Sequence, residues 1–165
     1  MISTCFERSS HPTARIGRWP DPLRDDQNAR VLVIDDSSDI RYLLDFFLRS
    51  ASIDVDLVGD GLAAMRWIDD RSPPDLVLLD RMLPTVSGER ILGAMRSREA
   101  WDAVPVVFVS ALATSSDVAT GLSLGASAYV TKPFVPIEVV RLIGELLAGE
   151  LARTDRVPDR AVIVQ

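Results

Sequence analysis

Residues 31–44, with the sequence VLVIDDSSDIRYLL, decide the fold. Four aliphatic residues are followed at once by Asp35 and Asp36. Apolar residues at helical spacing come next, and Ser37 or Ser38 can cap the helix that they predict. A short apolar run that gives way to an amphipathic helix is typical of a buried parallel strand with its following helix.

The same pattern recurs along the chain. Short runs rich in Val, Ile and Leu predict five strands, at residues 31–34, 54–58, 76–79, 106–109 and 128–130. The stretches that follow them predict five helices, because apolar side chains recur there every three or four residues. This alternation favours an α/β fold with a parallel sheet.

Length and composition favour one folded domain with short extensions. The chain has 165 residues, of which 47% are hydrophobic and 25% charged, the balance of an ordinary globular protein. We expect the domain to span residues 30–149. Residues 1–29 contain three Pro and no apolar periodicity, which predicts a flexible N-terminal leader. Residues 150–165 form a C-terminal tail, and neither extension reaches the roughly 50 residues of an output domain.

Charge and cysteine content limit the classes of partner. The formal net charge of −6 argues against phosphate attraction over the whole surface, so we expect no direct DNA binding. The longest nearly apolar stretch, residues 104–113, is too short to span a bilayer, so no membrane contact is expected. Cys5 is the only cysteine, which excludes a disulfide framework and agrees with a cytoplasmic location.

Polar residues follow the predicted strands at positions where they can meet. Asp35 and Asp36 follow the first strand, Asp80 the third, Ser110 the fourth and Lys132 the fifth. In open parallel sheets, ligands bind at the carboxyl ends of strands where the strand order reverses. Three carboxylates brought together there resist ionisation unless a cation neutralises them, and Mg²⁺ prefers such oxygen ligands. The sequence therefore predicts a Mg²⁺ site.

Four blocks carry a resemblance to a known family. VLVIDDSSDIRYLL, DLVLLDRMLPTVSG, VPVVFVSA and GASAYVTKPF resemble, in order, the signature blocks of bacterial two-component response-regulator receiver domains. The similarity spans about residues 30–149, and the chain resembles single-domain, chemotaxis-type regulators. It implies a flavodoxin-like, doubly wound five-stranded parallel sheet of order 2-1-3-4-5 with five helices.

The resemblance also implies roles for the residues at the strand ends. Asp80 matches the phosphoacceptor, which takes a phosphoryl group from a histidine kinase or a phosphotransfer protein. Asp36, Asp80 and the backbone carbonyl of Met82 match Mg²⁺ ligands, and Asp35 matches a residue that acts through a metal-bound water. Lys132, the only lysine among 18 basic residues, matches the ammonium that contacts Asp80 and then a phosphoryl oxygen.

Ser110 and Tyr129 match the switch pair of the family. The resemblance implies that Ser110 moves to bond the phosphoryl group and that Tyr129 then turns into the space that this movement opens. The face formed by the fourth helix, the last strand and the fifth helix is expected to meet a downstream protein target, or a second copy in a homodimer. The family also implies a cis peptide bond before Pro133.

Two apolar residues stand where receiver domains set the lifetime of the phosphoryl group. These are Met82, two residues after Asp80, and Leu112, two residues after Ser110. Neither side chain can orient an attacking water molecule. We therefore expect slow self-dephosphorylation.

Three other functions are compatible with parts of the pattern. A Mg²⁺-dependent phosphatase with Asp80 as nucleophile, as in haloacid-dehalogenase-like hydrolases, lacks its second Asp because Met82 stands there, so we expect no enzyme activity of this kind. A flavodoxin-like cofactor binder is disfavoured because Asp35 and Asp36 would repel a phosphate. A receiver that works without phosphorylation is the third alternative, and it stays open.

Overall fold

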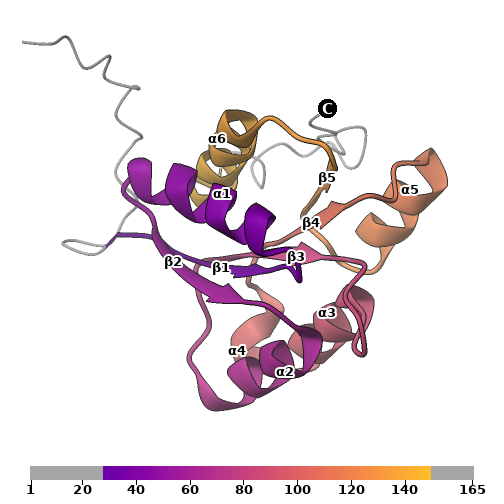
Figure 1. Ribbon diagram of the computed structural model, residues 1–165. Helices are drawn as coiled ribbons and strands as arrows, with labels where there is room; N and C mark the ends of the chain where they lie inside the picture. Colours follow the sequence, from indigo (N-terminus) through magenta and orange to yellow (C-terminus); the bar gives the residue numbers. More distant parts are fainter. Residues whose placement is uncertain (1–27, 150–165) are drawn as a thin grey trace, which may run out of the picture.

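The computed structural model describes residues 28–149. The predicted leader lies outside the described residues except for its last two, and the predicted C-terminal tail lies outside them completely. The elements in chain order (Figure 1) are β1 (Arg30–Ile34), α1 (Ser38–Ser50), β2 (Asp54–Val58), α2 (Gly61–Asp70), β3 (Leu76–Asp80), α3 (Gly88–Arg96), α4 (Glu99–Asp102), β4 (Val106–Ser110), α5 (Ser115–Ser123), β5 (Ala128–Thr131) and α6 (Pro136–Leu147).

The five strands form one parallel sheet in the order β2-β1-β3-β4-β5, which confirms the predicted topology. The strand order reverses at β1, because β1 pairs with β2 on one side and with β3 on the other. The crevice of such a fold therefore lies at the carboxyl ends of β1 and β3. Asp80 and Ser110 are themselves the last residues of β3 and β4.

Helices cover both faces of the sheet (Figure 1). One apolar core lies between the sheet and α1 and α6, and the other between the sheet and α2, α3, α4 and α5. Every residue of β3 and β4 is buried, and both central strands are apolar except for their last residues, Asp80 and Ser110. No helix within residues 28–149 is long and apolar enough to cross a membrane.

The described part of the chain has six helices, one more than predicted. The additional helix, α4, is a single turn of four residues and is too short to produce an apolar repeat. Trp101 anchors it, since this side chain is buried and its ring meets Trp67 of α2 edge-on at 5.8 Å between centroids. Arg96 donates hydrogen bonds to the carbonyls of Trp101 and Asp102, which satisfies the end of this turn.

Candidate functional site

Three acidic side chains meet at the carboxyl ends of β1 and β3. Asp35, Asp36 and Asp80 each offer a carboxylate oxygen, and these oxygens lie within 4.8 Å of one another. The sheet register explains this, because Ile34 pairs with Leu79 and the residues that follow are therefore neighbours. Asp35 and Asp80 are 2% and 5% exposed, whereas Asp36 is exposed to solvent. The cluster thus has a buried floor and an open side.

Lys132 reaches this cluster from the far side of β4. Its Nζ donates to Asp35 Oδ2 and to Asp80 Oδ2, each at 2.7 Å. Its backbone N–H donates to the carbonyl of Ser110 at 2.8 Å, which fixes the start of the side chain at the end of the sheet. The peptide bond between Lys132 and Pro133 is cis, as the resemblance implies. A single flexible cation thereby bridges two buried carboxylates.

The electrostatics of the cluster follow from burial and from these hydrogen bonds. Burial raises the pKa of the Asp35 carboxyl, although hydrogen bonds from Lys132 and from the Ser37 N–H oppose the rise. Burial alone would lower the pKa of Lys132, but its hydrogen bonds to Asp35 and Asp80 outweigh this effect and raise it. Lys132 is therefore a cation at neutral pH, and it contacts two buried acids, Asp35 and Asp80.

Backbone contacts fix the orientation of both buried acids. The N–H of Ser37 donates to Asp35 Oδ1 at 2.9 Å, and the N–H of Met82 donates to Asp80 Oδ1 at 2.7 Å. The start of α3 packs directly on the end of β3, since a Cβ on Gly88 would lie 2.3 Å from the Asp80 carbonyl oxygen. Only glycine permits this approach. One oxygen of each buried carboxylate is thus held by a backbone N–H two residues further along the chain.

The donor set fits a magnesium ion. Asp36 and Asp80 supply hard carboxylate oxygens that lie within 4.8 Å of each other, and the exposed Asp36 leaves a side open to water or to a phosphate oxygen. The ammonium of Lys132 offsets part of the negative charge but cannot offset all three acids. The Met82 N–H, rather than the Met82 carbonyl, contacts Asp80. The role of the Met82 carbonyl as a ligand therefore stays a prediction.

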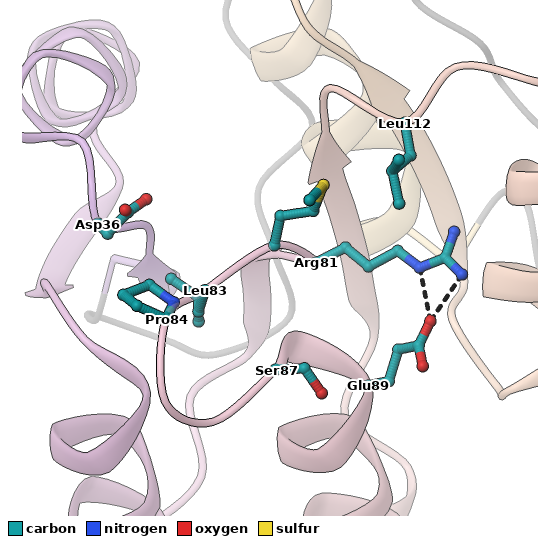
Figure 2. A pocket seen from close by; sticks show the side chains of 8 residues that line it. Asp36, Arg81, Leu83, Pro84, Ser87, Glu89 and Leu112 are labelled. Carbon is teal, nitrogen blue, oxygen red and sulfur yellow. Dashed lines mark hydrogen bonds and ion pairs between the residues drawn. The ribbon is translucent and has the colours of Figure 1, made fainter.

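An open groove of about 480 Å³ borders the acidic cluster (Figure 2). It follows the loop after β3 and reaches the loop after β4. Its lining residues are Asp36, Arg81, Met82, Leu83, Pro84, Ser87, Glu89 and Leu112. The Asp36 carboxylate therefore faces a space that a small molecule or a partner's side chain can enter.

Ser110 and Tyr129 are both fully buried, and both contact the backbone of Leu112, which lines the groove. The Ser110 hydroxyl accepts a hydrogen bond from the Leu112 N–H at 3.2 Å. The Tyr129 hydroxyl donates to the Leu112 carbonyl at 2.9 Å, and its ring lies 6.0 Å from that of Phe108. Tyr129 thus already occupies an inward position, which the resemblance had linked to phosphorylation.

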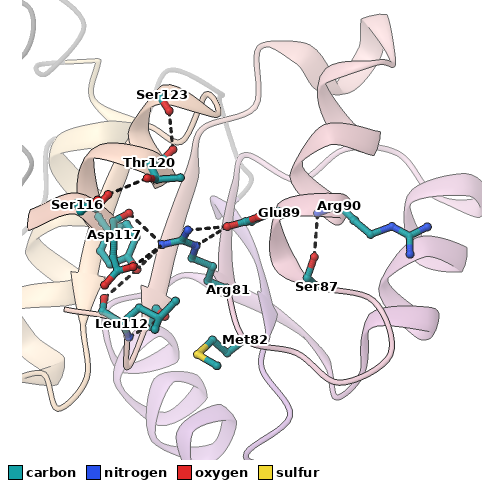
Figure 3. Close-up of polar contacts among 12 residues, drawn as sticks. Arg81, Met82, Ser87, Glu89, Arg90, Leu112, Ser116, Asp117, Thr120 and Ser123 are labelled. Carbon is teal, nitrogen blue, oxygen red and sulfur yellow. Dashed lines mark hydrogen bonds and ion pairs between the residues drawn. The ribbon is translucent and has the colours of Figure 1, made fainter. Parts of the chain in front are cut away.

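Arg81 is the prominent site residue that the sequence interpretation missed. It follows Asp80 directly and is only 8% exposed. Its guanidinium pairs with Glu89 of α3 and donates to the backbone carbonyl of Asp117 in α5 at 3.0 Å (Figure 3). The position of Arg81 in the sequence could have indicated this role, because a charged residue between a buried strand end and a short loop needs partners of opposite charge.

Comparison with known families agrees with this geometry. The family model described as response regulator receiver domain matches residues 31–144. The chain belongs to this family. Receiver domains of response regulators are signalling proteins rather than classical enzymes.

Solved receiver domains share the fold. The Francisella response regulator 1452 receiver domain is 29% identical to this receiver, with a TM-score of 0.67, and the match covers 78% of this chain and 100% of that one. The receiver domain of sensor histidine kinase PA1611 from Pseudomonas aeruginosa is 27% identical with a TM-score of 0.67, over 73% of this chain and 98% of that one. The latter structure is described with a magnesium ion in its active site cleft.

Curated relatives correct the expectation about DNA. DNA-binding response regulator MtrA of Mycobacterium tuberculosis is 36% identical over 134 residues, which are 81% of this chain and 55% of that protein. Regulatory protein VanRc of Enterococcus gallinarum is 39% identical over 111 residues, 67% of this chain and 46% of that protein. This receiver spans about half the length of these relatives.

The expectation of no direct DNA binding is therefore wrong as an inference from charge, because relatives of this receiver are named DNA-binding proteins. The net charge of −6 describes this sequence alone. It argues only against attraction over the whole surface, whereas DNA recognition depends on a local element placed against the duplex.

Proposed function

We propose that this receiver accepts a phosphoryl group on Asp80 from the phosphohistidine of a histidine kinase or a phosphotransfer protein. The observation that carries the proposal is the position of the Asp80 carboxylate. It lies at a buried strand end, bonded to Lys132, within a cluster of acids that borders an open groove. Membership in the receiver family supports the same function.

The proposed transfer is a nucleophilic displacement at phosphorus. An Asp80 carboxylate oxygen forms a bond to phosphorus as the bond to the donor imidazole nitrogen breaks, and the product is an acyl phosphate on Asp80. Lys132 gives up its contact with Asp80 and pairs with an oxygen of the transferred group. The N–H of Met82 keeps the second carboxylate oxygen in place during the displacement.

Asp36, Asp80 and the Met82 carbonyl are the residues proposed to hold Mg²⁺, with Asp35 beside them. When bound, the ion neutralises the negative charge of the incoming phosphoryl oxygens. Asp35 also fixes Lys132, because the two share a 2.7 Å hydrogen bond. In the receiver as proposed, Asp35 therefore positions the cation that Asp80 needs.

Ser110 is proposed to donate a hydrogen bond from its hydroxyl to an oxygen of the phosphoryl group, and so to carry the change from Asp80 to the loop after β4. Its hydroxyl now accepts a hydrogen bond from the Leu112 N–H, and this contact ends when Ser110 turns.

Phosphorylation of this receiver is expected in the cytoplasm, where histidine kinases present their phosphohistidine. The names of the relatives support an output directed to DNA.

The phosphoryl group is proposed to be long-lived. Met82 is 56% exposed beside the site, and Leu112 lines the same groove. Neither apolar side chain can hold a water molecule in line with the phosphorus atom. Decay of the Asp80 phosphate as fast as in chemotaxis-type receivers would contradict this part of the proposal.

The test is incubation of the chain with Mg²⁺ and acetyl phosphate, followed by intact mass measurement. We expect a gain of one phosphoryl group that is absent without Mg²⁺ and absent in Asp80→Asn. Asp39→Asn, which neutralises an exposed acid on α1, is the matched control and is expected to gain the group normally. No mass gain, or a gain that survives in Asp80→Asn, would refute the function. Continuous hydrolysis of a phosphate ester would favour the phosphatase alternative.

A further inference from the structure

Arg81, which directly follows β3, contacts two helices, α3 and α5. Its Nε donates to Glu89 Oε1 at 2.7 Å, and its Nη2 lies 2.6 Å from the same oxygen. Its Nη1 donates to the Asp117 carbonyl at 3.0 Å and lies 3.8 Å from Asp117 Oδ1. The same Nη1 lies 3.5 Å from the Tyr129 hydroxyl, which is the longest distance for a hydrogen bond. One guanidinium thereby links β3 to α3 and α5 (Figure 3).

Helix α5 has little apolar contact of its own with the core. Only Val118 and Gly121 are buried among its nine residues, and its exposed positions are rich in Ser and Thr. Packing of an apolar face is what holds most helices of globular proteins in place. A polar tether to Arg81 therefore contributes a larger share of the docking of α5 than it would for an ordinary helix.

Gly121 places the backbone of α5 directly against Tyr129. A Cβ at this position would lie 2.8 Å from both Cδ2 and Cε2 of the phenol ring. Asp117 and Gly121 are four residues apart and thus lie on the same face of the helix. In α5, the helical turn that contains Asp117 and contacts Arg81 is therefore followed by the turn that contains Gly121 and packs on Tyr129.

We propose that Arg81 is a positioning residue that keeps α5 closed over Tyr129, so that this tyrosine is buried whether or not Asp80 is phosphorylated. The hydrogen bond to Leu112, the Arg81 contact and the packing against Gly121 and Phe108 all come from groups other than the Asp80 carboxylate. A role of this arrangement in signalling rests on the proposed phosphoacceptor function. The burial of Tyr129 is independent of that function.

The chain offers an internal reference for the test. It contains two tyrosines, and Tyr42 on α1 is 74% exposed while Tyr129 is fully buried. Incorporation of 3-fluorotyrosine into the full chain gives two ¹⁹F signals, which Tyr42→Phe assigns. A soluble gadolinium chelate is expected to broaden the Tyr42 signal strongly and the Tyr129 signal weakly in the unphosphorylated chain.

Two variants test the role of Arg81. Arg81→Gln and Glu89→Gln are each expected to increase the broadening of the Tyr129 signal roughly fivefold, with that of Tyr42 unchanged. Glu89→Gln is the safer change for folding, because the Glu89 side chain is 41% exposed. Arg90→Gln is the matched control, since Arg90 is exposed on the same helix and points away from Arg81 (Figure 3).

The outcomes separate this proposal from the proposed function. A Tyr129 signal that is as accessible as Tyr42, or that becomes protected only after intact mass shows a phosphoryl group, would overturn the proposal. Unchanged protection in both folded variants would show that Arg81 does not hold α5. If acetyl phosphate adds no phosphoryl group while Tyr129 is protected as described, the phosphoacceptor function fails and the role of Arg81 stands.

Discussion

Two cations, Lys132 and Arg81, lie at the same edge of the sheet, and each bridges two acidic residues in a different way. Lys132 holds Asp35 and Asp80, whose side chains are 2% and 6% exposed. Arg81 holds Glu89 and Asp117, whose side chains are 41% and 27% exposed. The lysine thus compensates charges that water cannot reach, while the arginine pairs with charges that water partly solvates.

The difference suggests separate tasks for the two cations. A compact ammonium on a flexible stem can leave one oxygen for another without a change in the fold around it. A planar guanidinium that contacts two helices can move only if several of its contacts break at the same time. Lys132 therefore suits a site where bonds are exchanged, and Arg81 suits the joint between elements.

The largest effect is expected for Lys132→Met. Removing the ammonium leaves Asp35 and Asp80 buried without their cation, which is expected to lower the free energy of unfolding by about 3 kcal/mol at neutral pH. Urea denaturation measures this loss, and Mg²⁺ is expected to recover part of it. Arg90→Met, a change at an exposed cation, serves as control. A loss no larger than that of the control would contradict the assigned role of Lys132.

A smaller effect is expected for a methyl group placed between α5 and Tyr129. Gly121→Ala puts a Cβ into the phenol ring and is expected to cost about 2 kcal/mol of unfolding free energy. Gly93→Ala is the matched helical control, because no atom lies within 4 Å of its added Cβ, and a gain of up to about 1 kcal/mol is expected. Thermal and urea unfolding measure both changes, and effects of the same sign would be inconsistent with close packing of α5 on Tyr129.

The Arg81–Glu89 pair is expected to contribute less than the lysine cluster. A double-mutant cycle of Arg81→Gln and Glu89→Gln should give a coupling of about 0.5–1 kcal/mol, because solvent screens the half-exposed Glu89 carboxylate. Urea unfolding of the four proteins measures this coupling. A coupling as large as the loss in Lys132→Met would remove the distinction between the two cations.

The smallest effect is expected from the titration of Asp117. The hydrogen bond from the Thr114 hydroxyl lowers the pKa of Asp117 below its ordinary value of 3.8. A carboxyl whose folded pKa is lowered stabilises the protein above its unfolded pKa, and this stabilisation is lost as the pH falls through the folded value. The melting temperatures of the wild type and Asp117→Asn should therefore differ at neutral pH and converge below 3.8. An equal difference at both pH values would exclude this linkage.

The site at the strand ends could be predicted because a parallel sheet brings together residues that are far apart in sequence. Asp35 and Asp80 each follow a recognisable apolar run, and Lys132 stands out as the only lysine. The sheet order and the cluster geometry of the three acids agree with that prediction. Their chemical roles are still predictions, which the phosphorylation experiment addresses.

The contacts of Arg81 could not be predicted in the same way. Its partners lie 8, 36 and 48 residues away, and the direction of its side chain depends on how α3 and α5 pack against the loop after β3. No periodic pattern encodes that packing. The inward position of Tyr129 depends on the same packing, and the single turn of α4 is shorter than any helical repeat.

The presence of one lysine in the whole chain gives amine chemistry a single side-chain target. Acylation of a lysine amine converts it to a neutral amide. In most proteins that reaction spreads over many surface positions, but here it can fall only on Nζ of Lys132, between Asp35 and Asp80. Any lysine acylation within these 165 residues would therefore remove the cation that joins the two buried acids.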